Sequence, residues 1–97
     1  MNDDVIKLVK ELIKLAKEVE NDADFSIEIY AIVLKIMEYS NESISRSVQL
    51  SIYITCYEGM IRVSDDKRLT MKLHMDLRKL LEEENDGIHT AQVSDVS

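Results

Sequence analysis

Few residues in this chain have side chains able to carry out chemistry, and those few are widely spaced. The 97 residues include two histidines, His74 and His89, and one cysteine, Cys56. A zinc or iron site needs several such ligands at short spacing, and no two of these residues stand at ligand spacing. The scattered serines and acids also suggest no Ser–His–Asp group. We therefore expect no metal, no other cofactor and no enzymatic activity, with Cys56 as a small core residue.

Neighbouring acidic residues are more numerous, and paired carboxylates are a frequent basis of general acid–base catalysis. They occur at Asp3–Asp4, at Asp65–Asp66 and at Glu82–Glu84. These positions are the beginnings or ends of the helices expected below. At a helix start a carboxylate accepts free backbone amide protons and interacts favourably with the helix dipole, so capping explains the first two pairs. Glu82–Glu84 stands near a helix C-terminus, where negative charge is unfavourable, and has no such explanation.

The charge distribution is more informative than any catalytic motif. The formal net charge of −7 argues against a dedicated nucleic-acid binder, because phosphate binding needs a cationic face. Between residues 67 and 79, however, five basic residues accompany a single acid, Asp76. The five are Lys67, Arg68, Lys72, Arg78 and Lys79. They form either an ordinary solvated helix face or a docking surface for an acidic partner or an anionic membrane.

The elements that must position these residues show helical periodicity. Apolar residues recur every three or four positions over residues 3–20, with lysines and glutamates on the opposite face. Residues 25–40 are apolar around most of the circumference, which is typical of a helix inside a bundle. Asp24 is expected to cap this second helix. The absence of proline favours long uninterrupted helices throughout the chain.

The last periodic segment covers residues 65–85. A leucine stripe runs along it, with Met71 and Met75 placed beside the stripe. Ser64 or Asp65 is expected to cap its beginning. Its end is predicted at residues 85–87, since Gly87 tolerates the left-handed conformation beyond a helix end.

Residues 48–63 have two interpretations. The stretch VQLSIYITCY (residues 48–57) alternates strictly between apolar and polar residues, as a half-buried strand does, and Gly59 would turn the chain into a hairpin. As a helix, the same region has an apolar ridge at four-residue steps from Ile44 to Met60, which Gly59 would weaken or end. Two strands make a marginal sheet and both flanks are helical in pattern, which favours the helix without excluding the hairpin.

Together the patterns predict an all-α chain. We expect an antiparallel four-helix bundle over residues 1–85 and a flexible C-terminal tail over residues 86–97. No segment approaches the roughly 20 apolar residues of a membrane span, and the N-terminus has no signal-peptide pattern, so a cytoplasmic location is expected. Four tyrosines either edge the core with solvated hydroxyls or anchor a partner. They are Tyr30, Tyr39, Tyr53 and Tyr57.

Residues 48–81 resemble the second half of the enterocin A immunity family, the small proteins that protect producers of pediocin-like bacteriocins. That family has a third helix rich in aromatic residues, then an apolar–basic–apolar–Ser/Thr link into a leucine-striped fourth helix. Tyr53 and Tyr57 stand in the aromatic part of the pattern. The link corresponds to Ile61, Arg62, Val63 and Ser64, and the stripe to Leu69, Leu73, Leu77 and Leu80. The first half of the chain agrees only in length, amphipathicity and polarity.

The resemblance implies an antiparallel four-helix bundle and so favours a helix over residues 48–63. It also implies a cytoplasmic bacteriocin immunity protein that is not an enzyme. Such a protein recognises the membrane mannose phosphotransferase permease once bacteriocin is bound, and whether it also contacts the membrane surface stays open. The implied partner-binding residues are Tyr57, Arg62, Lys67, Arg68, Lys72, Arg78 and Lys79. A monomer is expected. The alternative is a small phage or plasmid regulator, antitoxin-like, whose acidic surface neutralises a basic protein partner.

Overall fold

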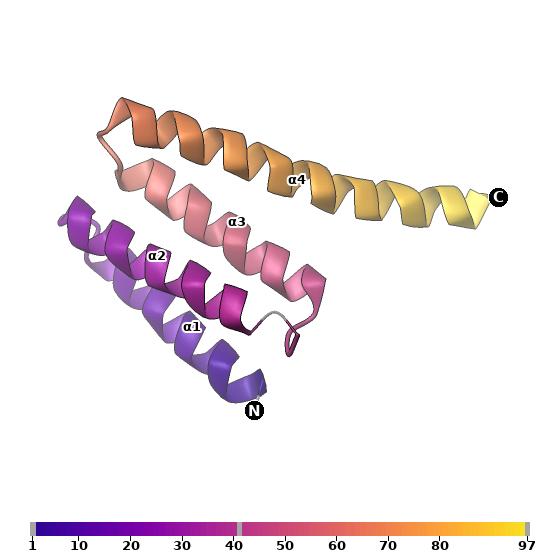
Figure 1. The fold of residues 1–97 in the computed structure, drawn as a ribbon, viewed down its shortest axis with the longest axis horizontal. Helices are drawn as coiled ribbons and strands as arrows, with labels where there is room; N and C mark the ends of the chain where they lie inside the picture. Colours follow the sequence, from indigo (N-terminus) through magenta and orange to yellow (C-terminus); the bar gives the residue numbers. More distant parts are fainter. Residues whose placement is uncertain (1, 41, 97) are drawn as a thin grey trace.

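The computed structural model describes residues 2–40 and 42–96, with side chains over residues 3–40 and 42–86. Four α-helices follow one another along the chain. They are α1 (Asn2–Glu18), α2 (Ala23–Tyr39), α3 (Arg46–Val63) and α4 (Lys67–Val96). Short connections reverse the chain direction at each step, so neighbouring helices run antiparallel (Figure 1). The predicted all-α, antiparallel four-helix bundle is confirmed, and residues 48–63 form a helix and not a hairpin.

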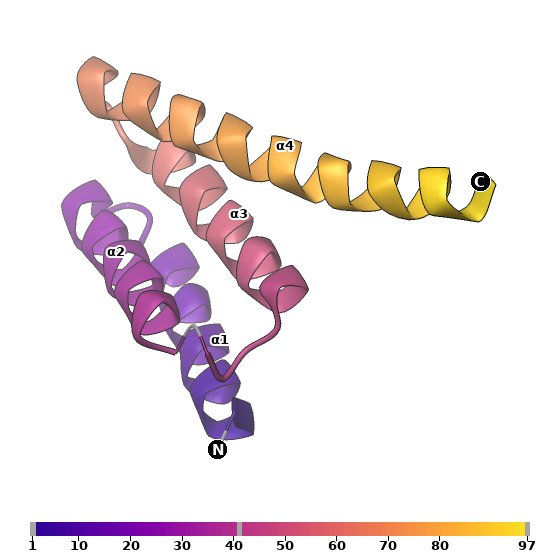
Figure 2. The same ribbon diagram turned by 45° about the vertical axis from the view of Figure 1, so that its right-hand side comes forward.

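The helices pack against one another in chain order. α1 lies against α2, α2 against α3, and α3 against α4. α4 diverges from the other helices along its length, and its C-terminal part extends beyond them in both views (Figures 1 and 2). The last helix therefore presents a wide face that no other helix covers.

The first two helices bury different amounts of their surface. On α1, Val9 and Ala16 are fully buried two turns apart, while Lys7, Lys10 and Lys14 are exposed on the opposite face. α2 packs against a helix on each side and buries a broader surface. Its buried apolar residues are Ile29, Tyr30, Val33 and Met37.

The buried positions of α3 follow the helical period and not the alternation of its sequence. Gln49 is only 1% exposed, whereas Ile54 is half-buried, the reverse of what a strand with its apolar residues inward would give. Gln49 accepts a hydrogen bond from Arg46 Nη1 at 3.3 Å, which helps to satisfy a buried amide. Cys56 lies fully buried two turns later, as expected for a small core residue.

The observed helix beginnings differ from the expected ones by one or two residues. Asp22, and not Asp24, caps α2, because its carboxylate accepts a hydrogen bond from the Phe25 amide at 3.2 Å. At the start of α4, Oδ1 of Asp66 accepts bonds from the amides of Arg68 and Leu69. More than one acidic residue lies near the start of α2 and of α4, and the backbone geometry decides which of them reaches the free amides.

The C-terminus also differs from the sequence-based expectation. α4 does not end at residues 85–87 but continues to Val96. Glycine permits a helix end without enforcing one, and no proline interrupts the backbone hydrogen bonds here. The side chains of residues 87–96 lie outside the described part of the chain, and a flexible tail over residues 86–97 stays a prediction.

Candidate functional site

Five of the seven residues assigned to partner binding lie together on the solvent-facing side of α4. They are Lys67, Arg68, Lys72, Arg78 and Lys79, and all five are exposed. The opposite side of the same helix packs toward α3 through Leu69 and the buried Leu73. The helix separates its apolar stripe from its cations, so the basic group predicted from the sequence is a continuous surface.

Two methionines occupy the middle of this surface. The side chain of Met71 is 67% exposed and that of Met75 is 59% exposed. Placing them beside the leucine stripe was wrong. Each follows a leucine, Leu69 or Leu73, by two residues, which at about 100° per residue turns it to the far side of the helix. The two-residue spacing between each leucine and the following methionine could therefore have predicted this orientation from the sequence.

The combined surface is here named the α4 outer face, and it has an apolar centre with a cationic rim. Met71 lies one turn after Lys67, and Met75 lies about one turn before Arg78. The residues of the α4 outer face are Lys67, Arg68, Met71, Lys72, Met75, Arg78 and Lys79. A shallow depression of about 480 Å³ adjoins it where Met71 and His74 meet the α3–α4 connection.

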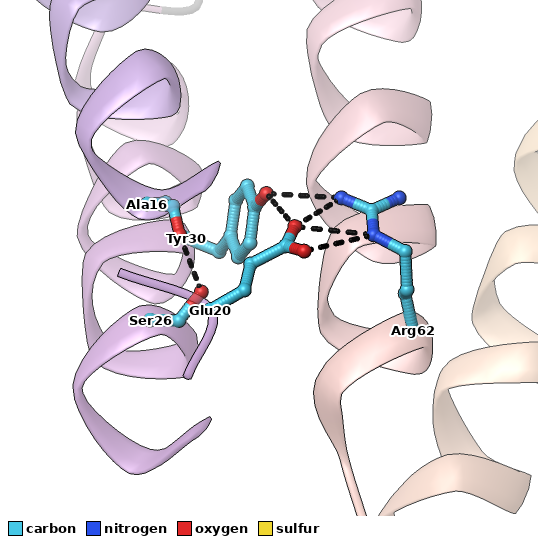
Figure 3. Close-up of polar contacts among 5 residues, drawn as sticks. All are labelled: Ala16, Glu20, Ser26, Tyr30 and Arg62. Atoms are coloured by element: carbon cyan, nitrogen blue, oxygen red, sulfur yellow. Dashed lines mark hydrogen bonds and ion pairs between the residues drawn. The ribbon is translucent and has the colours of Figure 1, made fainter. Parts of the chain in front are cut away.

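Arg62, although exposed, belongs instead to an intramolecular polar cluster with Glu20 and Tyr30 (Figure 3). Its Nε donates to Glu20 Oε1 at 3.1 Å, its Nη2 pairs with the same oxygen, and Nη2 also lies 3.5 Å from Tyr30 Oη. The hydrogen bond from Arg62 lowers the pKa of the Glu20 carboxyl, while burial is the main cause that raises the pKa of Tyr30. The cluster joins the α1–α2 connection, α2 and α3, so Arg62 already has an intramolecular partner.

A second polar link ties α1 to α2 close to this cluster. Ser26 is fully buried, and its hydroxyl donates to the carbonyl oxygen of Ala16 at 2.8 Å (Figure 3). Ala16 lies in the last turn of α1, where carbonyls lack the amide donors that a longer helix would supply.

Tyr57 lies in a different place again, in a groove of about 400 Å³ between α2, α3 and α4. We name this the tyrosine groove. Its wall on α3 carries Tyr53 and Tyr57, both half-buried, and Glu38 of α2 and Asp76 of α4 face them. Lys79 also lines it, so this residue stands at the border between the tyrosine groove and the α4 outer face.

An ion pair that spans α3 and α4 closes one end of the tyrosine groove. Arg46 Nε donates to Glu83 Oε2 at 2.6 Å, and Nη2 donates to Oε1 at 2.8 Å. The guanidinium carbon also lies 5.9 Å from the centre of the Tyr53 ring. The hydrogen bond from Arg46 lowers the pKa of Glu83. Sequence reasoning missed both residues, which are 37 positions apart, because only the packing of the two helices brings them together.

The remaining reactive residues do not assemble into a metal centre within the described part of the chain. Over residues 3–40 and 42–86, no three His, Cys, Asp or Glu side chains gather where they could hold a metal ion. Burial raises the pKa of the Cys56 thiol to about 12. His74 is exposed on α4, and His89 lies outside the described side chains.

Among the described helices, none combines the length and the apolar character needed to cross a membrane. Comparison with known proteins returned no match, either to a family model, to a curated protein or to a solved structure.

Proposed function

We propose that this chain is a bacteriocin immunity protein without enzymatic activity. In this proposal it acts in the cytoplasm and protects the producer cell by recognising the membrane mannose phosphotransferase permease with bound bacteriocin. The resemblance of residues 48–81 to the enterocin A immunity family is one support, and the four-helix fold which that resemblance implies is another. The observation that carries the proposal is the α4 outer face.

The composition of the α4 outer face supports binding in preference to simple solvation. A solvated helix face has no need of two adjacent methionines that are more than half exposed. Apolar groups inside a polar rim mark interaction sites, and flexible methionines adapt to the shape of a partner. The five cations of the α4 outer face, in a chain with a net charge of −7, would also orient this face toward an acidic surface.

Protection of a sensitive host tests the proposal directly. The wild-type chain is expressed in cells that are then challenged with a panel of pediocin-like bacteriocins, and selective survival to one or a few of them is expected. A triple variant with Lys67→Glu, Arg68→Glu and Lys72→Glu should keep the helical circular-dichroism spectrum and lose protection. The matched control is Lys7→Glu, Lys10→Glu and Lys14→Glu on the exposed side of α1, which changes the net charge equally and should still protect.

Two outcomes would contradict parts of the proposal. Killing by every bacteriocin despite good expression of the wild type would reject immunity. Full protection by the folded Lys67, Arg68 and Lys72 variant would remove the α4 outer face from the interaction. Replacing Met71 and Met75 together by serine separates the two components of this surface, because it deletes the apolar centre and leaves every charge in place.

The acidic charge of the chain favours one second candidate. A small phage or plasmid regulator, antitoxin-like, would use its negative surface to neutralise a basic protein partner. This candidate predicts no protection in the bacteriocin assay and stable co-purification of a basic protein, which mass spectrometry would identify. It also predicts that charge reversal on the α4 outer face leaves binding intact.

A further inference from the structure

The tyrosine groove contains two aromatic–carboxylate arrangements, and only one of them holds a cation. At one end, the Arg46 guanidinium lies near the Tyr53 ring and is held by the carboxylate of Glu83. Farther along α3, Tyr57 lines the same groove together with the carboxylates of Asp76 and Glu38, of which Asp76 acts more strongly on Tyr57. Within the part of the chain whose side chains are described, neither of these two carboxylates takes part in an ion pair.

The two carboxylates lie close enough to the aromatic wall to influence it. Burial raises the pKa of Tyr57, and the charges of Asp76 and Glu38 raise it further. Burial is also the main cause that raises the pKa of Tyr53; the charge of Glu38 raises it further, and the positive charge of Arg46 acts in the opposite direction. The Tyr57 end is therefore a negative, half-apolar site of the kind that favours a cation.

We propose that the Tyr57 end of the tyrosine groove binds an arginine side chain that is presented by a peptide segment of a partner protein. A planar guanidinium stacks on a tyrosine ring while donating hydrogen bonds to carboxylates at its edge, whereas a lysine ammonium is a more strongly hydrated point charge. Arg46 makes this same pair of contacts at the other end of the groove. The site goes beyond the proposed function, because it shares only Lys79 with the α4 outer face and selects the opposite charge.

Lys79 sets the balance of charge at the site. Because Arg46 and Glu83 neutralise each other, the remaining charged residues that line the groove are two carboxylates and Lys79. The lysine is exposed and opposes an incoming cation. Removing its charge should therefore strengthen binding, while removing the charge of Glu38 or Asp76 should weaken it.

Titration with short peptides, followed by NMR of the ¹⁵N-labelled full chain, tests the site. The probe is acetyl-Gly-Arg-Gly-amide, and its control contains citrulline, the neutral isostere of arginine. We expect shifts centred on residues Tyr53, Tyr57 and Asp76, with the citrulline peptide roughly tenfold weaker. Glu38→Gln combined with Asp76→Asn should weaken arginine binding to the citrulline level, and Lys79→Gln should strengthen it about twofold or more. These near-isosteric changes at surface positions keep the fold, which the NMR spectrum itself verifies.

Several results would overturn the inference. Equal binding of the arginine and citrulline peptides would reject a cation site, and equal binding of a lysine peptide would reject selection of guanidinium. Shifts confined to other surfaces would reject the location. Concentration-dependent dimerisation in light scattering, abolished by the Glu38 and Asp76 changes, would assign the groove to a second copy of this chain. The Glu38 and Asp76 variants separate this inference from the bacteriocin assay, because both residues lie outside the α4 outer face, whereas Lys79 belongs to both surfaces.

Discussion

The ring of Tyr30 on α2 lies directly against Gly59 on α3. A Cβ atom at position 59 would stand 2.6 Å from Tyr30 Oη and 2.7 Å from Cε2, closer than side-chain carbons pack. Tyr30 is fully buried, so its ring has little room to move away. Gly59 was expected to weaken or end its helix, but α3 continues past it to Val63. Its role is to let a large side chain of the neighbouring helix approach the backbone.

Gly59→Ala is therefore expected to destabilise the protein, although alanine is the better helix former. Overpacking of a core costs roughly 1–3 kcal/mol, and the gain in helix propensity offsets about 1 kcal/mol of that. The net loss in the free energy of unfolding should therefore be up to about 2 kcal/mol, measured by urea denaturation.

A double-mutant cycle with Tyr30→Leu shows whether the ring is the cause. In the Tyr30→Leu background the obstructing atoms are gone, so Gly59→Ala should become neutral or stabilising. An equal loss in both backgrounds would mean that the alanine collides with something other than the ring.

The ion pair between Glu20 and Arg62 predicts a dependence of stability on pH. The hydrogen bond from Arg62 lowers the pKa of Glu20 in the folded protein below its ordinary value of 4.5. A lowered folded pKa stabilises the protein above the unfolded pKa, and this stabilisation is lost as the pH falls through the folded value. Glu20→Gln should therefore lower the urea midpoint relative to wild type at pH 7, and by much less at pH 3. Glu28→Gln, an exposed change on α2, is the control and should show a similar small difference at both pH values.

The buried bond from Ser26 to the Ala16 carbonyl predicts a moderate loss on Ser26→Ala. Deleting the hydroxyl leaves a carbonyl in the last turn of α1 without this donor, which typically costs about 1–2 kcal/mol. Equilibrium unfolding in urea measures the loss. Ser51→Ala is the matched control on an exposed helical position, where the change should be neutral or slightly stabilising. Similar effects at both positions would show that the bond to Ala16 contributes nothing.

The thiol of Cys56 should be unreactive toward alkylating reagents while the chain is folded. Its side chain is fully buried, and burial raises the thiol pKa to about 12, so both access and the reactive thiolate are suppressed. At pH 8 iodoacetamide should label the native protein roughly a hundredfold or more slowly than the urea-unfolded chain. A Ser51→Cys variant supplies an exposed thiol in the same protein and should react at once. Rapid labelling of Cys56 without denaturant would contradict the buried position.

The periodicity of the sequence was sufficient to predict the helices but not every detail within them. The three- and four-residue spacing of apolar residues in α1 predicted the buried positions Val9 and Ala16, whereas Leu8 and Leu15 of the same pattern are 51% and 40% exposed. For residues 48–57 the local pattern favoured a strand, and the preference for a helix came from the lack of partner strands and from the family resemblance. An alternating segment becomes helical when both flanks are helices, since a strand alone leaves its backbone groups unsatisfied.

The candidate sites were predictable where they depend on one helix and not where they depend on several. The cations of the α4 outer face all lie on one helix, so their spacing in the sequence was sufficient to predict that they share a face. The pairs Glu20–Arg62 and Arg46–Glu83 join residues 42 and 37 positions apart, and only helix packing creates them. Arg62 consequently appeared available for a partner when taken from the sequence, whereas in the fold it holds three segments of the chain together.

The attachment of α4 mainly to α3 has a consequence for amide hydrogen exchange. Because α4 packs mainly against α3, it can separate from the bundle while the contacts among α1, α2 and α3 persist. Its amides should therefore exchange with deuterium sooner than those of α2 and α3. The surface proposed to recognise a partner thus belongs to a helix that opens more readily than α2 and α3. Binding of a partner should therefore slow amide exchange in α4 at lower partner concentrations than it slows exchange in the interior of the bundle.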